Sequence, residues 1–335
     1  MSWIALGIIR SMKNFWNKLN KPFFALAPME DVTDTAFRQV VASIGKPDVF
    51  FTEFANVDGI FSAGEKKVFP RLKFTSKEHP IVAQIWGAKL ENFTKAARLI
   101  AEMGFDGIDI NMGCPQKSVI KQKACSALIN YPEKAKEIFL AVKRGAGDLP
   151  VSIKTRIGFD KIQTEEWIGF LLELEPAVLT VHGRTVKEQS EGLAHWDEIG
   201  KVVKMRDKLK SKTLIMGNGD VASLDNAREK CQQYGVDGVM IGRGVFHNPW
   251  VFNPEVDLNK VTIKDRLKVL EKHLQLFEKS WQGEKDFNIL KKFFKAYIRD
   301  FDGASELRTK LMEVNNPQEV HNLLQGDALQ RTKQL

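Results

Sequence analysis

The chain has 335 residues, about twice the length of a typical single domain, so we expect one large domain and a smaller one. Hydrophobic residues make up 43% of the chain and charged residues 27%, which excludes a disordered or fibrous protein. Fifty lysine and arginine residues against 42 acidic residues give a formal net charge of +8. This excess allows a polyanionic partner without requiring one.

The three cysteines and the N-terminal segment indicate in which cellular compartment the protein is expected and whether it is anchored in a membrane. Cys114, Cys125 and Cys231 show no CxxC spacing and cannot all pair, so we expect no disulfide framework, no metal site and a reducing compartment, the cytoplasm. The apolar run WIALGII near the N-terminus is far shorter than the roughly 20 residues of a bilayer span, so no membrane anchor is expected. Residues 1–20 are predicted to be an extension outside the fold.

From Phe23 onward, short apolar runs alternate with segments of helical periodicity, which is the pattern of repeated βα units. Eight units within about 220 residues favour an α/β fold with a closed (β/α)8 TIM barrel over the alternative, an open doubly wound sheet. We therefore expect a catalytic barrel at residues 21–253. The predicted strands are residues 23–29, 49–54, 81–87, 107–113, 151–158, 178–184, 214–220 and 238–244.

After Asn248-Pro249 the strand pattern stops, and residues 262–325 are predicted to form a smaller all-helical C-terminal domain. Its segment 285–299 has five cations against one acid, interleaved with aromatic residues. The helical spacing favours a core role for the aromatic residues. The cations suit contacts with a phosphate backbone or, equally, a solvated face. The candidate contacts are Lys291, Lys292, Lys295 and Arg299.

Polar residues gather where the predicted strands end, which in a (β/α)8 barrel is the face that carries the chemistry. Six successive strands end in amide, thiol, cation or imidazole groups, and packing alone does not explain them because buried polar groups need partners. We expect their side chains to converge on one mouth. They are Gln84, Asn111, Cys114, Lys154, Arg156, His182, Arg184, Asn218, Asp220 and Arg243.

The last two strands end in the glycine-rich sequences GNGD and IGRG, at the position where such barrels often bind a phosphate. Glycines admit backbone N–H groups to an anion and Arg243 adds charge-assisted hydrogen bonds, whereas the alternative is that the glycines only turn the chain. A ligand with one phosphate and a polar planar ring, such as FMN, would place Gln84, Lys154 and His182 at its ring edge. Lys154 near N1 and the C2 carbonyl would stabilise a reduced flavin.

Cys114 lies in NMGCP, between a glycine and a proline that should fix its turn. Metal ligation lacks companion residues, and a nucleophile would need a base, for which His182 is the only good candidate at a strand end. An unperturbed thiol, with a pKa of about 8.5, is mostly protonated near neutrality. Proton donation is therefore the role that needs no neighbouring group to shift the pKa of the thiol. A structural role is the alternative, and packing roles are expected for Cys125 and Cys231.

Seven ordered segments make the chain resemble the tRNA-dihydrouridine synthase family: LAPMEDVTDTAFR, QIWG, DGIDINMGCPQKSV, IKTRIG, VHGRT, NGDV and DGVMIGRG. The resemblance covers residues 23 to 250, and residues 262–325 resemble that family's C-terminal helical domain. It implies an FMN-bearing barrel that reduces the C5–C6 double bond of a uridine in tRNA to 5,6-dihydrouridine, with NADPH (or NADH) as the reductant. It also implies hydride transfer from flavin N5 to C6 and proton transfer from Cys114 to C5.

The resemblance assigns site residues by position. Asn111, Cys114, Arg156 and Arg184 are implied to face the uracil. The implied flavin contacts, to which we add Asp220 from the same strand end, are Pro28, Met29, Gln84, Lys154, His182, Asn218, Gly219, Gly242 and Arg243. The chain departs from the family at Ser118 and Cys125, where Lys or Thr and Gly are frequent. The Cys114 loop is therefore expected to differ from that of other family members in its shape or in its contacts with phosphate. Lys117, Lys121 and Lys123 are the candidates to make such phosphate contacts in this chain.

A base stacked inside folded RNA cannot reach a flavin in a barrel mouth, so the uridine has to be extruded while basic surfaces bind the rest of the tRNA. We favour residues 285–299 for this contact over residues 201–212, an outer barrel helix with six cations and one acid. Two other functions remain open: a flavin barrel that reduces a free small molecule, and a catalytically silent tRNA-binding protein, against which Cys114 and Lys154 argue. A monomer without an obligate protein partner is expected.

Overall fold

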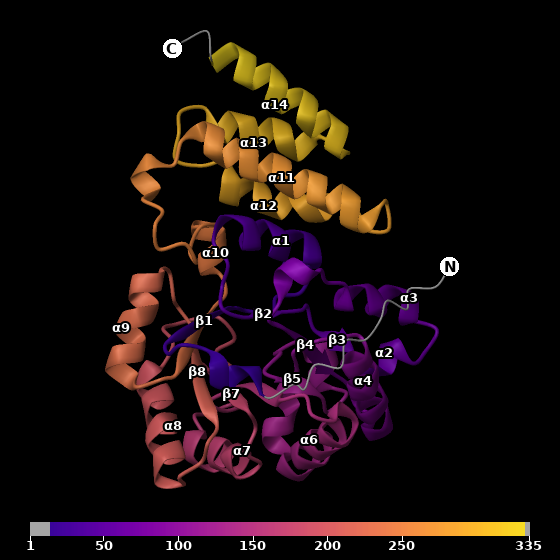
Figure 1. Cartoon of the computed structure of the whole chain (residues 1–335), viewed down its shortest axis with the longest axis vertical. Coiled ribbons are helices and arrows are strands. Elements are labelled where there is room, and N and C mark those ends of the chain that lie inside the picture. Colours follow the sequence, from indigo (N-terminus) through magenta and orange to yellow (C-terminus); the bar gives the residue numbers. More distant parts are fainter. Residues whose placement is uncertain (1–13, 332–335) are drawn as a thin grey trace.

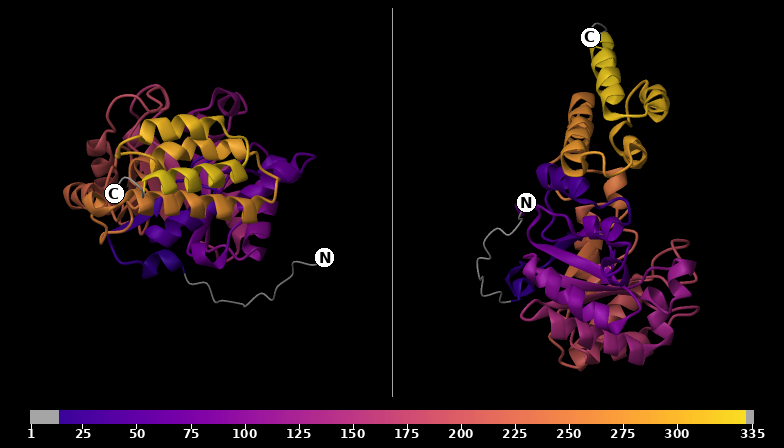
Figure 2. Two further views of the ribbon diagram at one scale, coloured as in Figure 1. Left: turned by 90° about the horizontal axis from the view of Figure 1, so that it is seen from above. Right: turned by 90° about the vertical axis from the view of Figure 1, so that its right-hand side faces the viewer.

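The computed structural model describes residues 14–331, which form a barrel of parallel strands with a stack of helices over one end (Figure 1). Figure 2 shows this stack as a separate layer whose helices lie side by side. The expected α/β barrel with a helical C-terminal region is confirmed. No helix within residues 14–331 is long and apolar enough to cross a membrane.

All strand pairs of the barrel are parallel, in the order β1-β9-β8-β7-β6-β5-β4-β2. A bridge between Ala25 and Val49 brings β1 back to the second strand position and nearly closes the ring. The strands are β1 (Phe23–Leu26), β2 (Phe50–Phe51), β3 (Ala55–Asn56), β4 (Ile81–Trp86), β5 (Gly107–Met112), β6 (Val151–Arg156), β7 (Val178–His182), β8 (Leu214–Asn218) and β9 (Gly238–Ile241).

The second strand differs from its prediction. Residues 49–54 were expected to be one strand, but β2 keeps only Phe50–Phe51, and the chain pairs with β4 again at β3. Between the two pieces, the Thr52 hydroxyl accepts a hydrogen bond from the Gln84 backbone N–H at 3.0 Å. The interruption leaves Glu53 buried at the mouth side of the barrel.

Helices surround the barrel because the longer ones bury an apolar stripe against the strands. Side-chain caps start several of them: Asp34 accepts from the Phe37 backbone N–H at the start of α1, and Ser223 accepts from that of Asn226 at the start of α9. The barrel helices are α1 (Thr35–Ile44), α2 (Val57–Ile60), α3 (Glu65–Val68), α4 (Leu90–Glu102), α5 (Lys117–Ile120), α6 (Pro132–Ala146), α7 (Gly169–Glu173), α8 (Trp196–Lys208), α9 (Leu224–Tyr234) and α10 (Gly244–His247).

The bottom of the barrel is covered by a segment that we expected to lie outside the fold. Residues Phe15–Lys18 form a short 3-10 helix, and Trp16 is only 1% exposed. Its ring packs against Phe23 and Phe51 of the first two strands, with ring centroids 5.6 and 6.3 Å apart. The expectation for residues 1–20 is therefore corrected for residues 14–20, while residues 1–13 lie outside the described part of the chain.

The C-terminal domain consists of α11 (Ile263–Trp281), α12 (Lys291–Tyr297), α13 (Ala304–Glu313) and α14 (Pro317–Arg331). A capping box formed by Thr262 and Asp265 starts α11, which packs on α1, while α12 packs on α10. The aromatic residues of α12 are buried, as their helical spacing predicted. This domain therefore rests on elements at the mouth side of the barrel.

Candidate active site

A cavity of about 540 Å³ opens at the C-terminal ends of β6 to β9. It brings together most of the predicted site residues, which come from strands that are far apart in the sequence. Gln84, Asn111 and Cys114 do not line it. The predicted residues in its wall are Pro28, Met29, Lys154, Arg156, His182, Arg184, Asn218, Gly219, Asp220, Gly242 and Arg243.

The charge of this cavity suits an anionic ligand. Lys154, Arg156, Arg184 and Arg243 line it against the single carboxylate of Asp220. Burial, and after it the charge of the neighbouring Arg156, lowers the pKa of Lys154 to about 8 against the opposing charge of Asp109. The Lys154 amine has no hydrogen-bond or ion-pair partner among residues 14–331. A desolvated amine without a partner gains most from a bound acceptor or anion.

Two glycines, Gly219 and Gly242, form part of the cavity wall. A Cβ at Gly219, whose φ is +128°, would lie 2.7 Å from Ala194 Cβ and 3.2 Å from His182 Cδ2. At Gly242, by contrast, the nearest atom to such a Cβ is 3.6 Å away. Packing against Ala194 and His182 therefore requires a glycine at position 219, and both glycines line the cavity at the β8 and β9 ends, where the sequence predicts a phosphate site. The Asn218 amide ties these strands together by donating to Met240 O at 2.8 Å.

Arg184 was expected to face the uracil, but its guanidinium is 1% exposed and mostly holds protein groups. It donates to Glu191 O at 3.0 Å, to Gly192 O, and to Asp220 Oδ2 at 2.6 Å. Burial opposes the ionisation of Asp220, but the hydrogen bonds from Arg184 and the Ala194 backbone outweigh it and lower the pKa of Asp220. Arg184 thus orders the loop after β7.

Arg184 also fixes the state of His182. Its Nη1 lies 3.3 Å from His182 Nε2, and since a guanidinium can only donate, this nitrogen accepts and the ring proton resides on Nδ1. Burial, and after it the charge of Lys154, lowers the pKa of His182 well below its usual range. The imidazole is therefore neutral at physiological pH and offers a single N–H donor.

Arg156, the other arginine expected at the uracil, bridges two loops. It donates to Gly113 O at 2.8 Å, to Thr185 O at 3.0 Å and to Gln189 O at 2.7 Å. These bonds join the turn after β5 to the loop after β7. Its charge lies near Cys114 and favours the thiolate there.

The side-chain amide of Asn111 holds the turn that carries Cys114 from within the turn. Asn111 Oδ1 accepts from the backbone N–H groups of Gly113, at 3.0 Å, and Cys114, at 3.1 Å. Ser126 Oγ donates to Cys114 O at 2.6 Å and ties the turn to the segment Cys125–Asn130. The Cys114 side chain is half-buried and packs beside Trp86 against the cluster of Val119, Ala124 and Cys125.

The Cys114 thiol is not the unperturbed group that the sequence suggested. A hydrogen bond with the Cys125 thiol lowers its pKa to about 7; burial opposes this shift, and the Gln116 backbone and Arg156 support it. Cys125 itself is 1% exposed, and burial raises its pKa well above the usual range. Its φ of +50° is a conformation that glycine adopts most readily. Cys125 is thus packed beside Cys114, and its thiol also affects the acidity of the Cys114 thiol.

Two buried acids near the mouth were not among the predicted site residues. Asp109 on β5 is 0% exposed and Glu53, just after β2, is 1% exposed. Burial raises the pKa of Asp109 to about 6 against hydrogen bonds from Ser152 and Gln84, and raises that of Glu53 to about 7. A charged residue inside an apolar strand run, as in GIDINM and VFFTEF, was the signal that could have found them.

Most of the cations expected to bind RNA contact protein carbonyls instead. Lys291 donates to Met312 O at 2.8 Å, Lys292 to Asp31 O at 2.9 Å and Arg299 to His247 O at 3.1 Å. Two of these three bonds join the helical domain to the barrel. Lys295 is exposed and has no such partner within the described residues.

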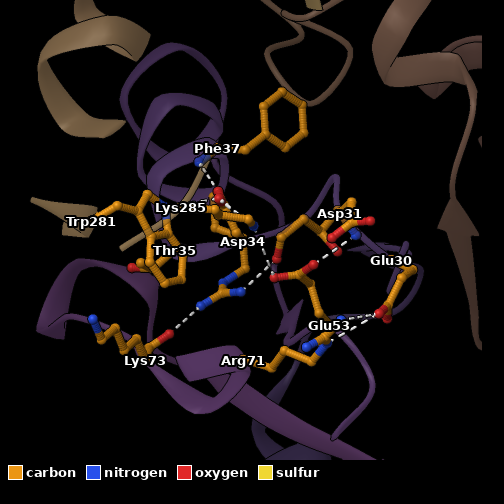
Figure 3. A network of polar contacts seen from close by, with 12 residues as sticks. Glu30, Asp31, Asp34, Thr35, Phe37, Glu53, Arg71, Lys73, Trp281 and Lys285 are labelled. Atoms are coloured by element: carbon orange, nitrogen blue, oxygen red, sulfur yellow. Dashed lines mark hydrogen bonds and ion pairs between the residues drawn. The ribbon is translucent and has the colours of Figure 1, made fainter. Parts of the chain in front are cut away.

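A polar network fastens the helical domain to the barrel (Figure 3). Lys285 Nζ lies 3.0 Å from Asp34 Oδ2 and 3.7 Å from Glu53 Oε2, and Trp281 Nε1 donates to Asp34 Oδ2 at 2.9 Å. Beside it, Arg71 pairs with Glu30. A second cavity of about 780 Å³ lies next to this network. Within residues 14–331, no cluster of three or more His, Cys, Asp or Glu side chains is placed to hold a metal ion.

The family model described as "Dihydrouridine synthase (Dus)" matches residues 25–333. The chain belongs to the dihydrouridine synthase family. The "Probable tRNA-dihydrouridine synthase" of Staphylococcus aureus (strain Mu50 / ATCC 700699) is 46% identical over 315 residues, which cover 93% of this chain and 95% of the relative. The "Probable tRNA-dihydrouridine synthase 2" of Bacillus subtilis (strain 168) is 45% identical over 315 residues, which cover 93% and 96%. The resemblance seen in the sequence is confirmed.

Two solved structures resemble this chain in their fold. A 2-naphthoyl-CoA reductase in complex with 2-naphthoyl-CoA has a TM-score of 0.54 at 10% identity, covering 68% of this chain and 49% of that chain. The 6-hydroxypseudooxynicotine amine oxidase of Pseudomonas geniculata N1 has a TM-score of 0.51 at 15% identity, covering 69% and 46%. These likenesses show the architecture alone.

Proposed function

We propose that this enzyme reduces the C5–C6 double bond of a uridine within tRNA to give 5,6-dihydrouridine, with FMN as its cofactor and NADPH or NADH as the reductant. The observation that carries the proposal is the pairing of a cationic, glycine-walled cavity with a cysteine turn fixed beside it. Membership of the dihydrouridine synthase family and the names of its relatives support the choice of substrate.

The residues present fit FMN. At the β8 and β9 ends, the backbone at Gly219 and Gly242 together with Arg243 would hold the phosphate. Lys154 and the neutral His182, which also line the cavity, would meet the polar edge of the ring system. When bound, FMN reduced by NADPH would supply the hydride for uracil C6.

The side chains of this chain supply the charge and the proton. The Lys154 ammonium, which lacks a partner in the described residues, would compensate the negative charge that a reduced flavin carries. Cys114 would hold the proton destined for uracil C5. Because its pKa is about 7, the thiol is a stronger acid than an ordinary cysteine and still partly protonated near neutrality.

The uridine has to leave the RNA stack to reach this mouth, and bases in RNA loops are the easiest to extrude. The helical domain rests on α1 and α10 beside the mouth, so RNA bound to it would lie next to the cavity. We therefore assign tRNA, rather than a free nucleoside, as the substrate.

The decisive experiment incubates the purified protein with FMN, NADPH and unmodified tRNA, then digests the RNA and measures its mass. We expect a gain of two daltons on a uridine, and a fall of about 10²- to 10⁴-fold in rate for Cys114→Ala, the size usual for a positioned acid. Turnover of free uridine but not tRNA would support a small-molecule reductase. Bound tRNA without any mass change would indicate a silent binding protein.

A further inference from the structure

A continuous chain of hydrogen bonds runs from the middle of β5 across to β4 and back to the Cys114 turn. Asp109 Oδ2 accepts from Gln84 Nε2 at 2.7 Å, and Gln84 Oε1 accepts from Asn111 Nδ2 at 3.0 Å. Asn111 Oδ1 then accepts from the backbone N–H groups of Gly113 and Cys114, at 3.0 and 3.1 Å. We refer to Asp109, Gln84 and Asn111 as the relay.

The register of β4 and β5 places the relay in the interior of the protein, where water does not compete for its hydrogen bonds. Gln84 and Asp109 are paired residues of adjacent strands, and Asn111 lies two residues farther along β5 on the same face. Asp109 and Gln84 are 0% exposed and Asn111 is 7% exposed. Hydrogen bonds in such surroundings are strong, and an unmade one is costly.

The direction of every bond in the relay is fixed by its two ends. A carboxylate can only accept, and backbone N–H groups can only donate. Gln84 must therefore turn its amide nitrogen toward Asp109 and its oxygen toward Asn111, and Asn111 must turn its oxygen toward the Cys114 turn. Flipping either amide would set two donors or two acceptors against each other.

The charge state of Asp109 supports this polarity. Burial raises its pKa to about 6, while hydrogen bonds from Ser152 and Gln84 and the charge of Lys154 oppose the shift. Ser152 Oγ donates to the other carboxylate oxygen at 2.6 Å. Asp109 is thus mainly ionised at neutral pH and accepts on both oxygens.

We propose that Asp109 is a positioning residue for Cys114 that acts through Gln84 and Asn111 to hold the Gly113–Cys114 turn, and with it the thiol, in place beside the cavity. This inference rests on the proposed role of Cys114 as the proton donor. A purely structural Asp109 would affect stability but not the reactivity of the thiol.

The inference can be tested by exchanging the amide of Gln84 and the carboxylate of Asp109 between the two positions. Gln84→Glu sets a second buried carboxylate against Asp109 and replaces the required N–H donor by a proton that the two carboxylates have to share. At pH 8, where this proton is lost more readily than at pH 6, we expect kcat for dihydrouridine formation to fall about 10²-fold relative to the wild type, with KM for tRNA within about twofold. In Asp109→Asn combined with Gln84→Glu, the new amide at position 109 can donate to the new carboxylate at position 84, which still accepts from Asn111. We expect this double variant to recover to within about fivefold of the wild type.

Alkylation of Cys114 by iodoacetamide, located by peptide mass spectrometry across pH 6 to 9, supplies a readout independent of turnover. We expect Gln84→Glu to change the alkylation rate about tenfold and to shift its pH midpoint, and the double variant to restore both. The matched control is Thr164→Ala, which removes a buried hydroxyl–carboxylate hydrogen bond of the same kind, to Glu198 at 2.6 Å, outside the relay. Its kcat and alkylation profile should stay within about threefold of the wild type.

The outcomes separate this inference from the proposed function. Wild-type enzyme that forms no dihydrouridine would overturn the function, while the alkylation cycle would still report whether Asp109 positions the thiol. A Gln84→Glu enzyme with normal kcat and alkylation, or a double variant no better than Gln84→Glu, would overturn the inference. If Gln84→Glu does not fold, the comparison moves to Asp109→Asn, which should alkylate more slowly than the double variant if the relay operates.

Discussion

At the scale of single residues, the acidity of Cys114 determines how the proposed reaction should respond to pH. Only the protonated thiol can donate, and its pKa is about 7 because of the contact with Cys125. We predict that the single-turnover rate of uridine reduction by pre-reduced enzyme is flat below pH 7 and falls about tenfold per pH unit well above it. Reduction of the enzyme by NADPH, measured on the same preparation, should lack this inflection.

Removing the neighbouring thiol should move that inflection. Cys125→Ala deletes the largest cause of the lowered Cys114 pKa and leaves burial, which raises it. We predict that the inflection of the single-turnover profile moves to higher pH, and that the maximal rate at low pH changes little. Cys231→Ala, on the outer helix α9, is the matched control and should leave the profile in place. An unchanged profile in Cys125→Ala would mean that Arg156 and the Gln116 backbone set the acidity.

At the scale of elements, the interruption between β2 and β3 places Glu53 under the helical domain, where Lys285 and Asp34 meet it (Figure 3). Burial raises the pKa of Glu53 to about 7; Lys285 opposes the shift and Asp34 adds to it. The folded protein therefore binds a proton that the unfolded chain releases between pH 4.5 and 7. Stability from this group is full below pH 4.5 and is lost as the pH rises through 7.

Glu53→Gln should remove this dependence. We predict that the wild type loses about 3 kcal/mol more unfolding free energy than Glu53→Gln between pH 4.5 and pH 8, measured by urea unfolding. Asp109 titrates in both proteins, so its share cancels in the difference. Glu284→Gln changes an exposed carboxylate that binds Lys73 in the same region and should have little effect. Equal pH slopes for wild type and Glu53→Gln would contradict the burial of an ionisable Glu53.

The positions of residues along strands could be predicted from the sequence, whereas their hydrogen-bond partners could not. Apolar runs predicted the barrel, and the rule that chemistry lies at strand ends placed Lys154, His182 and Asn218 around one cavity, because both depend on a residue's position along a strand. Hydrogen-bond partners depend on loop conformation, so no pattern revealed that Arg184 would hold the Gly192 carbonyl. Trp16 was missed for a similar reason, since a short 3-10 turn has no periodicity to detect.

At the scale of the whole molecule, the helical domain and the mouth form one continuous region. His247 lines the cavity, its carbonyl accepts from Arg299, and α12 packs on α10. Lys292 and Arg299 thus contribute to attaching the domain, whereas the exposed Lys295, on the same helix as Lys292, has no such protein partner within residues 14–331. A charge that binds no protein group can bind phosphate without breaking an existing bond, so we assign the RNA contact of α12 to Lys295.

The two basic segments can be compared by the salt dependence of tRNA binding. We predict that Lys295→Ala weakens binding a few-fold and reduces the slope of log K against log salt by about 1, because one phosphate contact and its released counterion are lost. Lys204→Ala, an equally exposed lysine on the outer helix α8, should leave the affinity and the slope unchanged. The opposite result would place the tRNA along α8. Because α12 is joined to the mouth through α10 and α8 lies on the outside of the barrel, only the first arrangement lets one RNA bind the helical domain while its extruded uridine enters the cavity.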